Sequence, residues 1–130
     1  MSQVGLLQVD QRDATPIYSQ IERGLRAAIA AGRLKIGDQL PTVRQLAVEL
    51  SVNANTVARV YADLERQGIL ETRRGVGSFV SASPVKARPP GEHQRRLKAF
   101  ATRVLADASA AGFSSDELIT QLRMQQKEGA

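Results

Sequence analysis

The feature that most constrains this chain is a pair of helix start signals with one short helix between them. Thr42 and Gln45 have the spacing of a capping box, in which each side chain satisfies a free backbone N–H. A short helix is therefore predicted at about residues 43–50. After a three-residue turn, Asn53 is a good N-cap for a second helix at about residues 54–67.

Another helix is predicted before this pair. Thr15 as N-cap and Pro16 as first helical residue mark its start, because the missing N–H of proline costs nothing there. Gly32 marks its end, since glycine adopts the left-handed conformation at a helix C-terminus. Between them, apolar residues recur at helical spacing on one face: Ile17, Ile21, Leu25, Ala28 and Ile29.

Strand signals lie on both sides of the three helices. Residues 69–74 and 78–80 flank a glycine-rich turn at residues 75–77, which predicts a β-hairpin. Leu6 to Val9 predicts a further small strand before the first helix. Residues 1–81 are therefore expected to form one domain of the α+β class.

A proline-rich segment separates this domain from a helical tail. Residues 82–91 contain three of the five prolines, and proline suits neither a helix interior nor a central strand, so we interpret them as a linker. The next helix is predicted at about residues 92–110, with Gly112 as its stop. Its apolar stripe consists of Leu97, Phe100, Ala101, Val104, Leu105 and Ala108. A capping box at Ser114 and Glu117 starts a last helix, with apolar residues at Leu118, Ile119 and Leu122.

The tail, residues 92–130, is too small to bury two apolar helix faces by itself. We expect it to form a dimerisation and effector unit that packs against a second copy of the chain across a twofold axis. The residues expected at this contact are Leu97, Phe100, Ala101, Val104, Leu105, Ala108, Leu118 and Leu122.

Composition excludes several classes of function. The chain has no Cys and one His, which argues against disulfides, thiolate sites and histidine metal clusters. No nucleophile–base pair, phosphate loop or nucleotide fingerprint is recognisable, so neither an enzyme nor a cofactor is expected. No apolar run approaches the ~18 residues of a membrane span, and no signal peptide is visible, so a cytoplasmic location is expected. The net charge of +5 favours polyanionic partners.

The order of helix, short helix, turn, helix and hairpin is that of a winged helix-turn-helix domain. This geometry projects the helix at residues 54–67 as a recognition helix into the major groove of DNA. Its first turn offers short polar side chains to base edges or phosphates, at Asn53, Asn55 and Thr56. Tyr61, by contrast, falls on the apolar stripe and is interpreted as a core residue.

Several sequence blocks, in order and at matching spacing, resemble the DNA-binding domain of the GntR family of bacterial transcription regulators. The resemblance covers about residues 14–81. It rests on PIYSQI (16–21), LKIGDQLPTVRQLA (34–47), NANTV (53–57), LERQG (64–68) and RGVGSFV (74–80). The short helical tail with its FSSDEL block (113–118) resembles the YtrA subfamily.

The resemblance implies a set of DNA contacts. Arg44 matches an arginine that reaches the DNA, and Gly75 matches a glycine that approaches the minor groove at the wing tip. The full expected set is Arg44, Asn53, Asn55, Thr56, Arg59, Arg74, Gly75 and Gly77. The family often has basic residues where Ala54 and Ala58 stand. Either the operator differs, or base readout depends on Arg44 and Arg59.

The resemblance further implies a homodimeric repressor that binds a pseudo-palindromic operator and controls a neighbouring operon for an ABC-type transporter. A small-molecule effector is compatible with this function, but no residue pattern identifies one. The alternative function is a winged-helix adaptor that binds proteins and not DNA.

Overall fold

The computed structural model describes residues 6–81 and 90–128. The chain divides into two compact units, one on each side of residues 82–89. The first unit contains α1 (Ile17–Ala30), α2 (Val43–Leu50), α3 (Ala54–Arg66), β1 (Leu70–Arg73) and β2 (Gly77–Val80). The second contains α4 (Glu92–Ala110) and α5 (Ser115–Glu128). The expected linker, residues 82–91, lies outside the described residues except for its last two.

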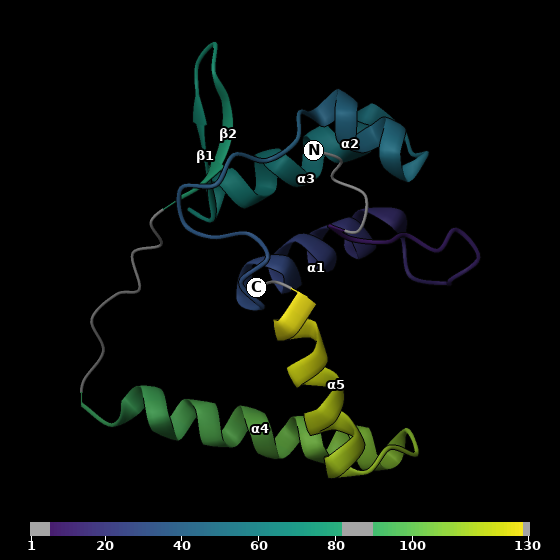
Figure 1. Ribbon diagram of the computed structural model, residues 1–130, viewed down its shortest axis with the longest axis vertical. Helices are drawn as coiled ribbons and strands as arrows, with labels where there is room; N and C mark the ends of the chain where they lie inside the picture. The colour runs from purple at the N-terminus through teal and green to yellow at the C-terminus, as the bar shows by residue number, and fades with distance from the viewer. Residues whose placement is uncertain (1–5, 82–89, 129–130) are drawn as a thin grey trace. The chain divides into compact units, whose positions relative to one another are not determined.

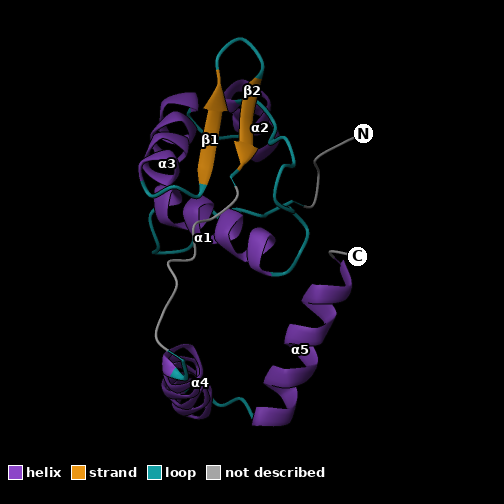
Figure 2. Cartoon of the chain, turned by 90° about the vertical axis from the view of Figure 1, so that its left-hand side faces the viewer, coloured by secondary structure: helices purple, strands orange, loops and turns teal. Residues whose placement is uncertain are grey.

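The first unit is a winged helix-turn-helix domain, which confirms the predicted fold class. Helix α3 packs against α1, α2 and β1, so it is the central helix of the unit. In the views of Figures 1 and 2, α2, α3 and the hairpin lie on the same side of α1. The tip of the hairpin points away from α1 in both views. The hairpin is therefore a wing that stands beside the helix pair.

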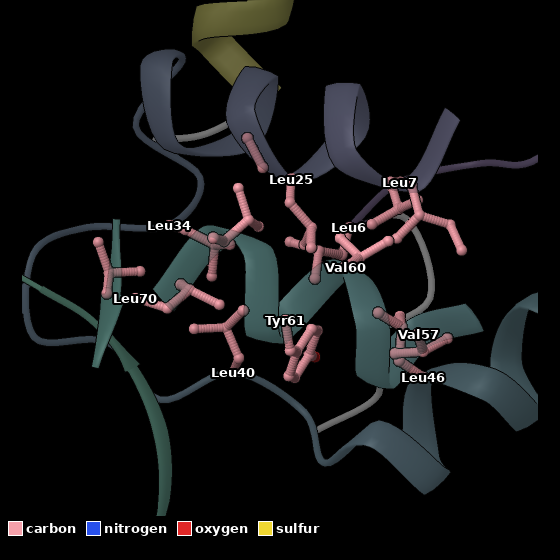
Figure 3. Close-up of a cluster of buried hydrophobic side chains, with 14 of the residues drawn as sticks. Leu6, Leu7, Leu25, Leu34, Leu40, Leu46, Val57, Val60, Tyr61 and Leu70 are labelled. Carbon is pink, nitrogen blue, oxygen red and sulfur yellow. The ribbon is translucent and has the colours of Figure 1, made fainter. Parts of the chain in front are cut away.

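One aliphatic core holds these elements together (Figure 3). The largest fully buried side chains come from α1, α2 and α3, at Ile21, Leu25, Leu46, Leu64, Val57 and Val60. Leu34, Leu40 and Leu70 add the loop before α2 and the first strand to the same cluster. Burying each such side chain contributes about 1.5–3 kcal/mol. The core thus fixes α3 and the wing base relative to α1.

Tyr61 is a core residue, as the sequence predicts. Its ring is buried, and its hydroxyl donates a hydrogen bond of 2.7 Å to the carbonyl oxygen of Pro41. Burial raises the pKa of this hydroxyl well above its usual range. The bond connects α3 to the segment immediately before α2, so it helps to set the angle between the two helices.

The predicted helix boundaries inside the helix pair are confirmed. The Thr42 hydroxyl accepts from the Gln45 N–H at 3.0 Å, and the Gln45 side chain accepts from the Thr42 N–H at 2.8 Å. The Asn53 side-chain oxygen accepts from the Asn55 N–H at 2.8 Å, which caps α3. Ser51 takes the left-handed conformation with φ 57°, which allows the three-residue turn between the helices.

The start of α1 differs from the prediction. Pro16 is the N-cap residue, not the first helical residue, because its ψ of 145° is extended. The Thr15 side chain caps nothing. Instead, Gln20 reaches back and donates to the carbonyl oxygens of Asp10 and Thr15. The end of α1 is as predicted, since Gly32 has φ 82° and follows the C-cap residue.

The strand expected at Leu6 to Val9 is wrong. Residues 7–10 form no regular structure, and the segment is held by its side chains. Leu6 and Leu7 are buried in the core. Leu7 lies against α1 at Gly24, where an added Cβ would lie 2.8 Å from the Leu7 Cβ. Apolar burial on a helix, and not strand pairing, explains this apolar run.

The hairpin is present, but its turn lies one residue earlier in the chain than predicted. Arg73 pairs with Gly77, so the turn consists of Arg74, Gly75 and Val76. The loop segment at residues 38–40 also pairs with β2. The sequence does not indicate this pairing. Gln39 forms a bridge with Phe79, the Leu40 N–H donates to the Ser78 carbonyl oxygen at 2.9 Å, and the Val80 N–H donates to the Asp38 carbonyl oxygen at 2.9 Å. This pairing braces the wing against the loop before α2.

The second unit consists of two helices with very little buried surface. Helix α4 has the predicted bounds, and the capping box at Ser114 and Glu117 is present. Hydrogen bonds from Ser114 hold the pKa of the Glu117 carboxyl below its usual value. Although α4 and α5 contact each other, none of residues 90–127 is buried. Several large apolar side chains are exposed: Leu97, Phe100, Leu105, Phe113, Ile119, Leu122 and Met124.

No helix among the described residues is long and apolar enough to cross a membrane.

Candidate nucleic-acid interface

The first candidate contact is Arg44, the second residue of α2. The capping box fixes the first turn of this helix, and the Arg44 side chain is exposed. A surface ion pair with Glu22 or Glu49 is the alternative reading of this arginine. In residues 6–81 and 90–128, however, Arg44 has neither an ion pair nor a side-chain hydrogen bond. Its five N–H donors are therefore available to a phosphate or a guanine edge.

The first turn of α3 carries the second group of candidates. Asn53 and Asn55 are exposed, and Thr56 is half-buried. Asn53 uses one lone pair of its side-chain oxygen to cap the helix, so its amide NH₂ is the main group that remains for a ligand. Asn55 points outward and has both ends of its carboxamide available, which is the donor–acceptor pair that reads an adenine edge.

Arg59 lies one turn beyond Asn55 on the same face of α3. Its guanidinium carbon is 5.3 Å from the centroid of the Tyr18 ring, which belongs to α1. This is within the range of a cation–π contact. The arginine remains exposed, and the tyrosine is half-buried. Sequence spacing gives no signal for this contact, because it joins two helices that are distant in the chain.

The wing tip provides the third group. Gly75 is exposed with φ 77°, at a turn position that favours glycine, and an added Cβ there would meet no atom within 4 Å. Arg74 is exposed, and within the described part of the chain it makes no ion pair. Arg73 differs from its neighbour. Its guanidinium pairs with Glu71 at 3.5 Å and lies 4.1 Å from the centroid of the Phe79 ring. Both arginines are exposed, but among the described residues only Arg73 is engaged by an ion pair and an aromatic ring, so Arg74 is the better candidate for a DNA contact.

Gly77 has a structural reason to be glycine. Its φ is 141°, and an added Cβ would lie 2.7 Å from Nε2 of Gln39. The same Nε2 donates to the carbonyl oxygen of Val76 at 3.0 Å. Gln39 thus supports the wing from its base, and Gly77 makes room for it. Sequence reasoning missed Gln39, since its partner is far along the chain.

The chemistry of these candidate groups suits DNA better than a small ligand. The expected residues come from α2, α3 and the wing, which lie on one side of α1 (Figure 1). Two unpaired arginines, a stacked arginine and several amide groups contribute donors, and none of the candidates is a carboxylate. A surface with cationic and amide donors on a projecting helix and hairpin fits phosphates and base edges.

Comparison with known proteins agrees with this geometry. The model of the family described as bacterial regulatory proteins, gntR family, matches residues 17–80. The HTH-type transcriptional repressor YtrA of Bacillus subtilis (strain 168) is 37% identical over 113 residues, which cover 87% of this chain and 86% of that protein.

Two solved structures are also similar. YtrA from Sulfolobus acidocaldarius, a GntR-family transcription factor, has a TM-score of 0.57 at 32% identity, covering 78% of this chain and 98% of that one. The DNA-binding domain of AraR in complex with operator ORX1 has a TM-score of 0.53 at 26% identity. That match covers 58% of this chain and 96% of that one.

Proposed function

This chain belongs to the GntR family of bacterial regulatory proteins, and from this premise we propose that it is a homodimeric repressor of a neighbouring transport operon. It is a DNA-binding transcription regulator and not an enzyme. The observation that carries the finer proposal is the pairing of two features. One is a set of mostly exposed candidate contacts on α2, α3 and the wing. The other is a tail whose apolar residues are exposed.

The proposed operator contacts are the eight residues of the expected set. Arg44, Asn55 and Arg59 would read base edges or phosphates in the major groove. Arg74 and Gly75 would approach the adjacent minor groove, whose negative potential attracts arginine. For Asn53 and Gly77, the capping bond and the contact with Gln39 already account for the residue type, so their proposed DNA contacts are additional.

Dimerisation is supported by the second unit. An amphipathic helix of 19 residues without one buried side chain leaves its apolar stripe in water, and this is unfavourable unless another surface covers it. A second copy would cover it symmetrically and would place two recognition helices on the two halves of a pseudo-palindromic operator. An effector that changed the geometry of this dimer would change the match to the half-site spacing.

The resemblance of the tail to the YtrA subfamily supports repression of a neighbouring operon for an ABC-type transporter. The similarity to the Bacillus repressor over most of both chains supports repression. A regulator that binds DNA is also expected in the cytoplasm.

The test is selection of binding sites from random duplex DNA, followed by titration of the selected duplex at several salt concentrations. We expect a pseudo-palindromic consensus that recurs upstream of the protein's own operon. Affinity should fall steeply as salt rises, because phosphate contacts release counterions. Enrichment of no sequence by the folded protein would favour the protein-binding adaptor instead.

Arg44→Ala tests the contact assigned to α2. We expect operator binding to weaken by about 1–3 kcal/mol, the range of a good base contact. The melting temperature should stay close to that of the wild type, since the side chain is exposed. Arg23→Ala, which removes an exposed arginine of α1, serves as the charge-matched control. Equal operator affinity of Arg44→Ala and wild type would remove Arg44 from the contact set.

A further inference from the structure

The contact between Arg59 and Tyr18 is the feature of the interface that the DNA-binding assignment does not explain. Arg59 belongs to α3 and Tyr18 to α1, and the guanidinium lies over the ring at 5.3 Å from its centroid. Tyr18 packs against the hydrophobic core. Ile21 in α1 and Val57 and Val60 in α3 are fully buried, so the two helices are fixed against each other. Tyr18 is partly buried and packs against this core, so its ring has less rotational freedom than a fully exposed side chain.

We propose that Tyr18 is a positioning residue for operator recognition, and that its ring holds the Arg59 guanidinium in the orientation in which it contacts DNA. This inference rests on the proposed DNA-binding surface and adds a residue of α1 to it. Tyr18 acts through Arg59 and is not itself assigned a base contact.

The chemistry of the pair favours this role. A guanidinium that lies over a ring face uses none of its five N–H donors for that contact, so all of them remain for phosphate or guanine acceptors. A free arginine side chain loses much rotational freedom when it binds. The ring removes part of that freedom before DNA arrives, which strengthens binding by pre-organisation.

The other arginine of α3 shows the contrast. Arg66 lies on the same face two turns further along, but it forms an ion pair with Asp63. An ion pair occupies donors and cancels charge. In the part of the chain that the structure describes, Arg59 makes no such pair. Its support is therefore of the kind that leaves it able to bind an anion.

A double-mutant cycle on the selected operator duplex tests the proposal. Tyr18→Leu is expected to weaken binding by about two- to fivefold, the scale of an exposed cation–π contact. Arg59→Ala should weaken it more, by about five- to 150-fold. In the Arg59→Ala background, Tyr18→Leu should have no further effect. Tyr18→Phe keeps the ring and should bind as the wild type does.

Repeating the site selection with the variants measures the base preference at each operator position. A change in protein stability alone would not alter this preference. Arg59→Ala should relax base preference at one position of each half-site, and Tyr18→Leu should partly relax the same position. The matched control is a second cycle of Tyr18→Leu with Arg66→Ala, which should be additive. Circular dichroism confirms that each variant is folded.

Three outcomes would overturn the inference while leaving DNA binding intact. Additive effects of Tyr18→Leu and Arg59→Ala would show that the two residues act independently. A loss in Tyr18→Phe equal to that in Tyr18→Leu would show that the hydroxyl, and not the ring, matters. Tighter binding by Tyr18→Leu would show that the ring restrains Arg59 away from DNA. If wild-type protein selects no sequence at all, the proposed function fails, and this inference fails with it.

Discussion

Leu97→Glu together with Leu105→Glu is expected to convert the proposed dimer into a monomer and to weaken operator binding by about 10²–10⁴-fold. Both leucines lie on the apolar stripe of α4 and are 51% and 46% exposed. Charges there would have to be desolvated in a dimer, which is costly without a partner of opposite sign. Once the link between two DNA-binding units is lost, the gain from binding two half-sites together is lost too.

Analytical ultracentrifugation measures the first effect and operator titration the second. The charge-matched control is Thr102→Glu with Ala106→Glu, two exposed positions on the opposite face of the same helix. This control should remain dimeric. Removal of residues 84–130 should likewise leave a folded monomer, since the core of the first unit contains no residue of the tail. Dimeric behaviour of the Leu97→Glu, Leu105→Glu variant would exclude the stripe as the interface.

Local signals in the sequence were sufficient to place the helices. The capping boxes at Thr42 and Ser114 and the glycines after α1 and α4 act within four or five residues, so spacing alone reveals them. Gly112 marks the end of α4 in this way, while its predicted start rests on the end of the proline-rich segment. The start of α1 was misplaced because its stabilising bonds come from Gln20, a side chain inside the helix, and not from Thr15 before it.

Contacts between distant segments could not be predicted in the same way. The Leu6 to Val9 run has strand-like composition, but Leu7 packs on a helix at Gly24. The stacking of Arg59 on Tyr18 and the support of the wing by Gln39 depend on how the core brings α1, α3 and β2 together. The helix-turn-helix geometry indicates Asn53, Asn55 and Thr56 as candidate contacts, and the family resemblance adds the other five. The structure shows which of them face outward, and DNA binding by each stays a prediction.

Gly75→Val is expected to reduce operator affinity by about 2–5 kcal/mol, more than Arg74→Ala does. The wild-type glycine has φ 77°, a conformation that costs a β-branched residue about 1–2 kcal/mol or more, so the free wing tip would relax into another turn. Binding would then have to restore the original turn. The valine side chain would also keep the backbone of the tip away from the groove floor and remove contacts of about 1–3 kcal/mol.

Salt dependence separates the two wing variants. Arg74→Ala should reduce the slope of log affinity against log salt by about one unit if the guanidinium meets a phosphate, whereas Gly75→Val removes no charge and should leave the slope nearly unchanged. The valine side chain creates no steric clash within the protein, because a Cβ at Gly75 meets no protein atom within 4 Å. A loss of affinity therefore does not come from disturbed packing. Gly75→Asn, which tolerates positive φ, tests conformation apart from bulk.

Folded Gly75→Val protein with wild-type affinity would mean that the wing does not reach the DNA. Recognition would then depend on α2 and α3 alone.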